Sequence, residues 1–249
     1  MSYGDGYLVR SDATTYPDGL VLGSHDHPWG QLAFCNSGLM RVTTDAASWL
    51  APPTRAIWLP AGVAHEIVMR GETATRFLYL APELAAPLPA ALCVYEVAPL
   101  LRELILHVLK IRMLHPDAPP QARLAQLLID LLLQARTQDL ALPLPRDRRA
   151  RALADRVQAR PGEPASLADL ARRAGASLRT LQRLFPAETG LTLEAWRQKA
   201  RLIAAVAALS NGAPVGVTAA DCGYESASAF IAAFKRQFGV TPARYGARL

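Results

Sequence analysis

The last third of the chain contains two helix-turn-helix patterns in tandem, joined by one expected helix, and this arrangement limits the fold more than any other feature. In the first pattern, residues 166–189, Ser166 and Asp169 form an approximate capping box before an amphipathic helix. Gly175 ends that helix, and Ser177 is a candidate cap for a second one. Arg- and Gln-rich helices are common on protein surfaces, so this pattern alone is a weak signal.

The second pattern follows Gly212 and makes the interpretation much stronger. A short helix is expected near 215–222, Gly223 turns the chain, and Ser226 caps the next helix. The two candidate recognition helices begin about 49 positions apart, and residues 192–209 between them predict a helix of about 27 Å. B-DNA repeats about every 34 Å, so two readers on such a spacer would enter successive major grooves on one face.

Residues 166–249 resemble the DNA-binding domain of the AraC/XylS family of bacterial transcription regulators. The matching residues are Ser177, Arg179, Leu181, Arg183, Phe185, Gly190, Arg201, Ala205, Ala219, Gly223, Tyr224, Ser226, Ser228, Phe230, Phe234, Phe238, Gly239, Thr241 and Pro242. The resemblance implies a sequence-specific regulator that binds double-stranded promoter DNA. RNA polymerase is a further candidate partner.

The first recognition helix carries most of the side chains expected to read bases. The family's base-reading positions fall on Arg179, Gln182 and Arg183, and Thr180 lies on the same outer side. Arg and Gln form bidentate contacts with guanine and adenine edges in the major groove. In the second recognition helix only Ser228 can donate to a base edge, so we expect that helix to add thymine-methyl contacts and shape fit.

Charge divides the chain at the same place. Residues 146–249 contain 17 Lys or Arg against 8 Asp or Glu, a net of +9, whereas residues 1–145 contain 10 against 13. The basic part would attract phosphates, and the acidic remainder would not compete for them. We expect Ser177, Ser226, Lys235 and Arg236 to contact phosphates.

The first 80 or so residues show little helical periodicity. Gly, Pro and Asn-Ser signals separate five short apolar segments: Gln31–Phe34, Leu39–Thr43, Arg55–Leu59, Glu66–Met69 and Arg76–Leu80. This pattern is typical of an all-β sandwich or barrel. The chain is therefore predicted to be a multi-domain α+β protein.

Four parts are expected. They are a cupin-like effector-sensing β-barrel at 1–95, a helical dimerisation or connecting segment at 96–139, a linker at 140–147, and an all-α DNA-binding domain with two helix-turn-helix motifs at 148–249.

Three histidines and a glutamine form a candidate metal or effector site in the barrel. His25, His27 and Gln31 share strand parity, and a Pro60–His65 turn delivers His65 from another strand. The spacings resemble the two motifs of the cupin barrel, with Gln31 in place of the acidic residue. Three imidazoles and an amide can hold Zn²⁺, Ni²⁺, Fe²⁺ or Co²⁺, although Gln is a poor ligand. The alternative is a metal-free effector pocket with no cofactor.

A second function is a metal-dependent cupin enzyme with an accessory nucleic-acid-binding module. Only Asp26 and Glu66 lie beside the histidines as carboxylates, so no general base is evident. We therefore expect the protein not to be an enzyme. Control of DNA binding by a small molecule or a metal in the barrel is favoured.

Two amphipathic helices are expected at 96–110 and 120–136, each with a leucine-rich stripe. The stripes favour a homodimer interface, with Leu128 as an outward position on the second helix. The alternative is that both stripes simply cover the barrel.

The sequence predicts a cytoplasmic protein without a membrane partner. Residues 1–7 lack the pattern of a signal peptide, and no apolar run approaches the roughly 20 residues that span a bilayer. Three cysteines without a CxxC pattern suggest reduced thiols.

Overall fold

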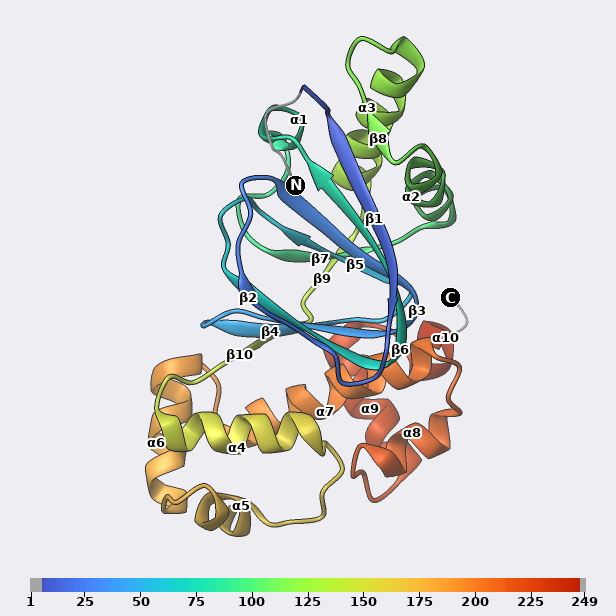
Figure 1. Ribbon diagram of the computed structural model, residues 1–249. Helices are drawn as coiled ribbons and strands as arrows, with labels where there is room; N and C mark the ends of the chain where they lie inside the picture. Colours follow the sequence, from blue (N-terminus) through green and yellow to red (C-terminus); the bar gives the residue numbers. More distant parts are fainter. Residues whose placement is uncertain (1–5, 247–249) are drawn as a thin grey trace. The chain divides into compact units, whose positions relative to one another are not determined.

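The computed structural model describes residues 6–246 and divides into two compact units. The first comprises the chain up to Thr44 together with Ala51–Leu140, and the second comprises Asp45–Leu50 together with the chain from Ala141 onward. Strands dominate the first unit and helices dominate the second (Figure 1). The predicted multi-domain α+β class is confirmed.

The first unit is built on antiparallel strands. Their bounds are β1 Val9–Tyr16, β2 Val21–His25, β3 Gly30–Thr43, β5 Arg55–Leu59, β6 His65–Leu80, β7 Cys93–Glu96, β8 Met113–Leu114 and β9 Thr137–Gln138. Their hydrogen-bonded order is β8-β1-β6-β3-β5-β7-β9, and β2 also pairs with β6. Strand β6 is thus the partner of β1, β2 and β3, and it positions most of the unit.

Strands β3 and β6 are each one long strand where the sequence suggested two. Their register runs from Gly30 opposite Leu80 to Thr43 opposite Glu66, with shifts on either side of Ser37. Gly38 has a φ of +78°, and a Cβ added to it would lie 2.4 Å from Thr73 Oγ1. The Asn-Ser-Gly sequence therefore forms a bulge that bends β3 instead of a turn that ends it.

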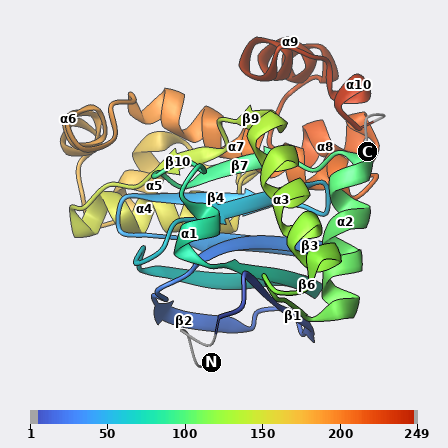
Figure 2. The ribbon, with the colours of Figure 1, turned by 90° about the horizontal axis from the view of Figure 1, so that it is seen from above.

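Helices α1 (Pro82–Ala85), α2 (Pro99–Ile111) and α3 (Pro119–Gln134) complete the first unit. Helices α2 and α3 lie side by side along the sheet (Figure 2). Their apolar faces join one core cluster with strand residues such as Leu32: Leu101, Leu104, Ile105 and Val108 from α2, and Ala125, Leu128, Ile129 and Leu132 from α3.

The prediction that Leu128 faces outward was wrong, because its side chain is fully buried in this core. The sheet exposes an apolar face that must be covered, and the main stripe of each helix covers it. A narrower strip remains on the outer side of α3, where Leu127 is 39% exposed and Leu124 and Leu131 are half-buried.

The second unit is mainly helical. Its helices are α4 Arg148–Ala159, α5 Leu167–Arg173, α6 Leu178–Thr189, α7 Leu193–Ser210, α8 Val215–Asp221, α9 Ala227–Phe238 and α10 Pro242–Gly246. Strand β10 (Ala141–Pro143) pairs with β4 (Ala47–Ala51), which comes from the first half of the sequence. Helix α7 buries nine residues and contacts α4, α6, α8, α9 and α10, so it is the centre of the unit.

The segment interpreted as a linker is held firmly to this unit. The Trp196 indole Nε1 donates a 2.6 Å hydrogen bond to the carbonyl oxygen of Pro143. The Glu188 carboxylate accepts hydrogen bonds from the backbone N–H groups of Arg146 and Asp147 at 2.6 and 2.9 Å. Asp147 in turn caps α4.

Within residues 6–246, no helix combines the length and the apolar character that crossing a bilayer requires.

Candidate functional site

Helices α5 and α6 form the first helix-turn-helix motif at the predicted positions. The Ser166 hydroxyl accepts a hydrogen bond from the Asp169 backbone N–H, and Ser177 does the same for Thr180, both at 3.1 Å. Gly175 adopts a φ of +70° between the helices, a conformation that L side chains rarely adopt. The predicted capping residues are therefore confirmed as the local cause of this motif.

Helices α8 and α9 form the second motif in the same way. Gly223 turns the chain with a φ of +75°, and the Ser226 hydroxyl accepts a 3.2 Å hydrogen bond from the Ala229 backbone N–H. Phe230 and Phe234 are fully buried beneath α9. Each recognition helix thus has one face fixed in the core and one face open to solvent.

The exposed face of α6 carries Arg179, Gln182 and Arg183, while Leu181 and Phe185 are buried on the opposite side. Thr180, predicted as a base-reading residue, is half-buried, and its hydroxyl lies 2.8 Å from that of Ser177. Thr180 is thereby engaged at the helix cap, which leaves Arg179, Gln182 and Arg183 as the exposed candidates for base reading on α6.

The exposed face of α9 is mostly apolar and small. Ser228, Ile231 and Ala232 lie on it, with Lys235 and Arg236 also exposed toward the end of the helix. Ile231 is 37% exposed, which suits a contact with a thymine methyl group better than a hydrogen bond to a base.

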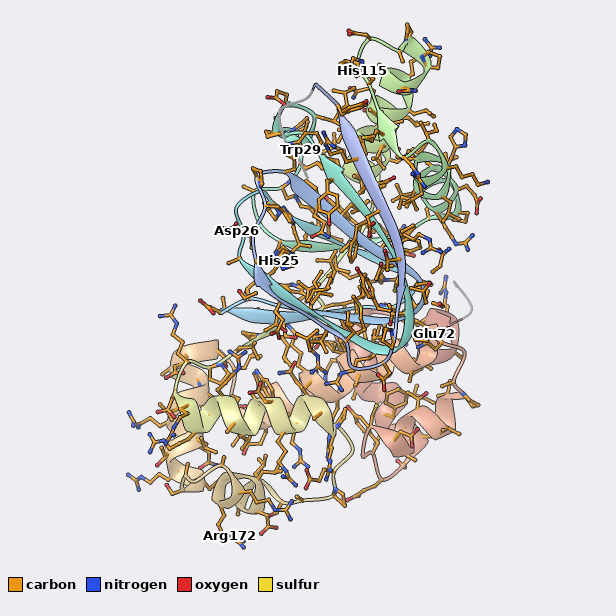
Figure 3. The ribbon with its side chains drawn as sticks, in the orientation of Figure 1. His25, Asp26, Trp29, Glu72, His115 and Arg172 are labelled. Carbon is orange, nitrogen blue, oxygen red and sulfur yellow. The ribbon has the colours of Figure 1, made fainter. Side chains whose placement is uncertain are left out.

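Charges in this unit fall into two groups. Arg172 pairs with Asp169, and the Glu163 carboxylate accepts hydrogen bonds from Arg156 and Arg173. Hydrogen bonds from Arg156 hold the pKa of Glu163 below its usual value, with a smaller contribution from Arg173, so the carboxyl stays ionised. Figure 3 shows Arg172 extending from α5 away from the unit.

The cations of the recognition helices are different. Within the described part of the chain, no ion pair engages any of Arg179, Arg183, Lys235 and Arg236. These four charges therefore remain available to phosphates and base edges.

The predicted histidine cluster assembles in the first unit. His25 ends β2 and pairs with His65 at the start of β6, while His27 lies in the loop after β2. Ring centroids are 4.4 Å apart for His25 and His65, 5.2 Å for His27 and His65, and 6.1 Å for His25 and His27. Gln31 lies on β3, so the shared parity of the motif does not come from a single strand.

The cluster is buried on one side only. His27 and His65 are 6% and 1% exposed, whereas His25 is exposed. Figure 3 shows His25 next to Asp26 at the edge of the strand-rich unit.

All three rings are held in one tautomer. Each Nδ1 faces a backbone carbonyl two residues away, at 2.7 Å for His25, 2.5 Å for His27 and 2.8 Å for His65. A carbonyl oxygen can only accept, so each Nδ1 carries a proton and donates it. The Nε2 of a ring that is neutral is then an acceptor.

Gln31 links this cluster to Tyr79, which was not among the predicted site residues. The amide of Gln31 lies 2.9 Å from His27 Nε2 and 3.5 Å from the Tyr79 hydroxyl. In the structure the amide oxygen of Gln31 faces His27 Nε2, and its NH₂ donates to the Tyr79 hydroxyl. Because Nδ1 of His27 already donates to the Trp29 carbonyl, a neutral His27 ring requires the amide to be turned over, with its NH₂ facing Nε2 and its oxygen facing Tyr79. Tyr79 was missed because it comes opposite Gln31 only through the register in which β3 pairs with β6.

His65 is the most deeply buried member and has an open acceptor. No protein atom makes a hydrogen bond to its buried Nε2 in the described structure. Burial lowers the pKa of His65 to about 4, and the charges of His25 and His27 contribute to that lowering. His65 is therefore neutral near pH 7.

A metal fits the chemistry of this cluster but not its arrangement. Neutral imidazoles suit Zn²⁺, Ni²⁺, Fe²⁺ or Co²⁺. Among residues 6–246, however, no three His, Cys, Asp or Glu side chains are placed as a ligand set, and Gln31 is engaged between His27 and Tyr79.

Sequence comparisons agree with both units. Residues 13–154 match the AraC-like ligand binding domain, and residues 170–248 match a helix-turn-helix domain. The transcriptional regulator NimR of Escherichia coli K12 is 36% identical over 232 residues, covering 93% of this chain and 85% of NimR. The transcriptional regulator RipA of Corynebacterium glutamicum is 36% identical over 103 residues, covering 41% of this chain and 31% of RipA.

Two solved structures are also similar. ToxT of Vibrio cholerae O395 aligns with a TM-score of 0.42 at 11% identity, covering 97% of this chain and 98% of ToxT. The DNA-binding domain of AdpA in complex with a target DNA aligns with a TM-score of 0.38 at 31% identity, covering 41% of this chain and 91% of that domain.

The relatives are transcription regulators and not enzymes, so the cupin-enzyme alternative has no support from them. The ligand-binding match spans more than half of the chain, and NimR is related along nearly all of it. The protein therefore belongs to the AraC family of DNA-binding transcription regulators.

Proposed function

We propose that this regulator binds promoter DNA through both helix-turn-helix motifs, and that a small molecule bound at the histidine cluster controls the binding. The observation that carries the proposal is the pair of capped, solvent-facing helices α6 and α9 with unpaired cations in one compact unit. The cytoplasm is the expected site of action.

The two helices have unequal roles in this proposal. On α6, Arg179, Gln182 and Arg183 read base edges, because they are exposed, long and able to form bidentate contacts. On α9, Ser228 adds one hydrogen bond and Ile231 an apolar contact. Further phosphate contacts come from the cations of α9 and from the N-terminal turns of both helices, where Ser177 and Ser226 lie.

The effector is a small molecule with at least one N–H or O–H group. His65 offers a buried Nε2 acceptor without a protein partner, which is unfavourable until a donor fills it. An anion is a poor match for His65, because its buried neutral ring presents an electron pair and not an N–H group. His25, which is exposed, marks the side from which a ligand enters.

Two copies of the chain associate through the outer strip of α3. Leu127 is exposed there, with Leu124 and Leu131 one helical turn away on either side. Leu127→Glu is expected to give a folded monomer in sedimentation velocity, whereas the neighbouring exposed change Gln126→Glu leaves the dimer intact. A wild-type chain that is already monomeric at micromolar concentration would remove this part of the proposal.

The test of DNA binding uses the full chain and duplex fragments from the region around its own gene. Fluorescence anisotropy should show an affinity that falls steeply as salt rises, because cations of the second unit displace counterions from phosphates. Selection from a random duplex library should then return a motif whose strongest positions depend on Arg183. Binding that does not respond to salt, or no enriched motif, would contradict the proposal.

The effector test screens small alcohols, amines, amides and phenols by thermal shift, with Zn²⁺ as a separate arm. A ligand of the cluster should raise the melting temperature of the wild type and change its affinity for DNA. His65→Leu should abolish both effects, and the exposed residue His107 provides the matched control His107→Leu. Stabilisation by Zn²⁺ alone would replace the small molecule with a metal as the ligand.

A further inference from the structure

Helix α7 holds the loop between α4 and α5 with two arginines. Arg201 Nε donates to the carbonyl oxygen of Pro161 at 3.0 Å. Arg197 Nη2 donates to the carbonyl oxygens of Glu163 and Ala165, both at 2.9 Å. The two arginines are four positions apart and therefore share one face of α7. The loop that enters the first motif is thus fixed to the helix that joins the motifs.

The same loop touches the turn of the second motif, backbone against backbone. A Cβ added at Gly162 would lie 2.0 Å from the carbonyl oxygen of Asp221 and 2.8 Å from its carbonyl carbon. A Cβ added at Gly223 would lie 2.9 Å from Arg201 Nη2 and 3.1 Å from the Cα of Gly162. Neither position has room for a side chain. In Figure 1 this loop leaves the end of α4 on the side of the unit where α8 lies.

These contacts close a ring between the two motifs. Helix α7 already joins the motifs, because it packs against α6 of the first motif and against α8 and α9 of the second. The meeting of Gly162 with the Asp221–Gly223 turn adds a second connection, and Arg201 contacts both sides of it. A second connection, backbone against backbone, further restricts the rotation of one motif relative to the other.

We propose that Gly162, Gly223 and Arg201 are positioning residues that lock α6 and α9 in one relative orientation, so that the protein selects the spacing between its two half-sites. The proposal rests on the proposed function, in which both helices enter DNA. Because the backbones approach so closely, one methyl group added at Gly162 should be enough to disturb the orientation of the two helices. Gly162→Ala must push the Asp221 carbonyl away by about 1 Å, because Cβ atoms essentially never approach backbone oxygens below 3.0 Å.

The first experiment measures the orientation without DNA. Nitroxide labels are attached to the exposed positions of Ala187→Cys on α6 and Gln237→Cys on α9, in a full-length chain in which Cys93 is replaced. The buried Cys35 and Cys222 are kept, because Cys222 lies in the turn of the second motif. Double electron–electron resonance should give one narrow distance for the parent chain and a shifted or broadened distribution for Gly162→Ala. Arg201→Met keeps the apolar stem, removes the hydrogen bond to Pro161, and should broaden the distribution as well.

Two controls separate positioning from stability. Gly216→Ala adds a Cβ that meets nothing within 4 Å, and Val157→Ala removes buried volume in α4 while leaving the three lock residues unchanged. Both should keep the narrow distance, although Val157→Ala lowers the melting temperature. If Gly162→Ala does not fold, Arg201→Met decides. A distance distribution unchanged by the folded lock variants would overturn the proposal.

The second experiment measures the consequence on DNA. Duplexes carry the selected half-sites at separations that differ by one base pair, and binding is measured for the parent, Gly162→Ala and Val157→Ala. The parent and Val157→Ala should prefer one separation by at least about tenfold over its neighbours. Gly162→Ala should flatten or shift that profile while keeping the base preference of α6. If the parent chain binds DNA in a salt-dependent manner but shows no preference for one separation, the proposed lock is refuted and the proposed function is retained.

Discussion

Acidification should destabilise the first unit through His65 in particular. The folded chain holds the pKa of His65 at about 4, whereas the unfolded chain restores the ordinary value of 6.5. Between pH 4 and pH 6.5 the His65 ring is protonated in the unfolded state and neutral in the folded state. Stability is therefore unaffected above pH 6.5 and is lost as pH falls toward 4.

The size of the effect follows from the same two pKa values. The loss would reach about 1 kcal/mol at pH 5.5 and about 2 kcal/mol at pH 4.5, after allowance for screening by water on the side of the cluster where His25 is exposed. The His65 side chain itself is only 1% exposed, so most of the shift should persist.

The assay compares urea unfolding of the wild type and His65→Asn across pH 7.5 to 4.5, followed by tryptophan fluorescence. Asparagine can still donate to the Val63 carbonyl but does not titrate, so the variant should lose less stability on acidification than the wild type. The exposed control His107→Asn should follow the wild type. If the stability of the wild type and of His65→Asn falls in parallel as pH decreases, the folded ring accepts its proton normally. The assignment of an unpartnered buried acceptor at His65 would then be wrong.

Two further predictions concern DNA reading and the bulge. Arg183→Ala should weaken the selected site by about 1 to 3 kcal/mol and relax preference at one or two base pairs, whereas Lys235→Ala should weaken all sequences nearly equally; an unchanged selected motif for Arg183→Ala would refute its role. Gly38→Ala should lower the stability of the first unit by about 1 to 3 kcal/mol, because the φ of Gly38 is +78° and an added Cβ would meet Thr73. The control Gly23→Ala adds a Cβ that meets nothing within 4 Å and should have little effect. Equal melting temperatures for the two variants would contradict this reasoning.

The helical unit could be predicted closely because its signals are local. Hydroxyl caps at Ser166, Ser177 and Ser226, and the turn glycines after α5 and α8, each act within three or four residues. The boundaries of α7 and α8 also agree with the expected ranges to within one residue. Local capping chemistry is readable without knowledge of the rest of the chain.

The strand-rich unit was harder because its outcome depends on distant partners. The Asn36–Gly38 sequence is a good turn signal, but Thr73 on β6 and the continuing ladder make it a bulge. Strand β1 has a polar, alternating sequence and was not expected; it is held by pairing with β6 along its whole length. The buried position of Leu128 likewise depends on which face of the sheet needs cover.

The histidine cluster was predicted by residue identity, but its tautomers and the role of Tyr79 were not. These depend on carbonyl directions and on the register between β3 and β6. The direct roles of the predicted DNA-contacting residues stay predictions.

The pairing of β10 with β4 has a practical consequence for anyone who wishes to excise the DNA reader. A fragment that starts at Arg148 removes the Pro143 carbonyl and leaves the buried indole N–H of Trp196 without its acceptor. A fragment that starts at Ala141 keeps that acceptor but separates β10 from residues 47–49, leaving an open strand edge that invites association with other copies. The reader is discontinuous along the gene, so supplying residues 45–50 as a separate peptide or a fused strand should improve the solubility of the excised fragment.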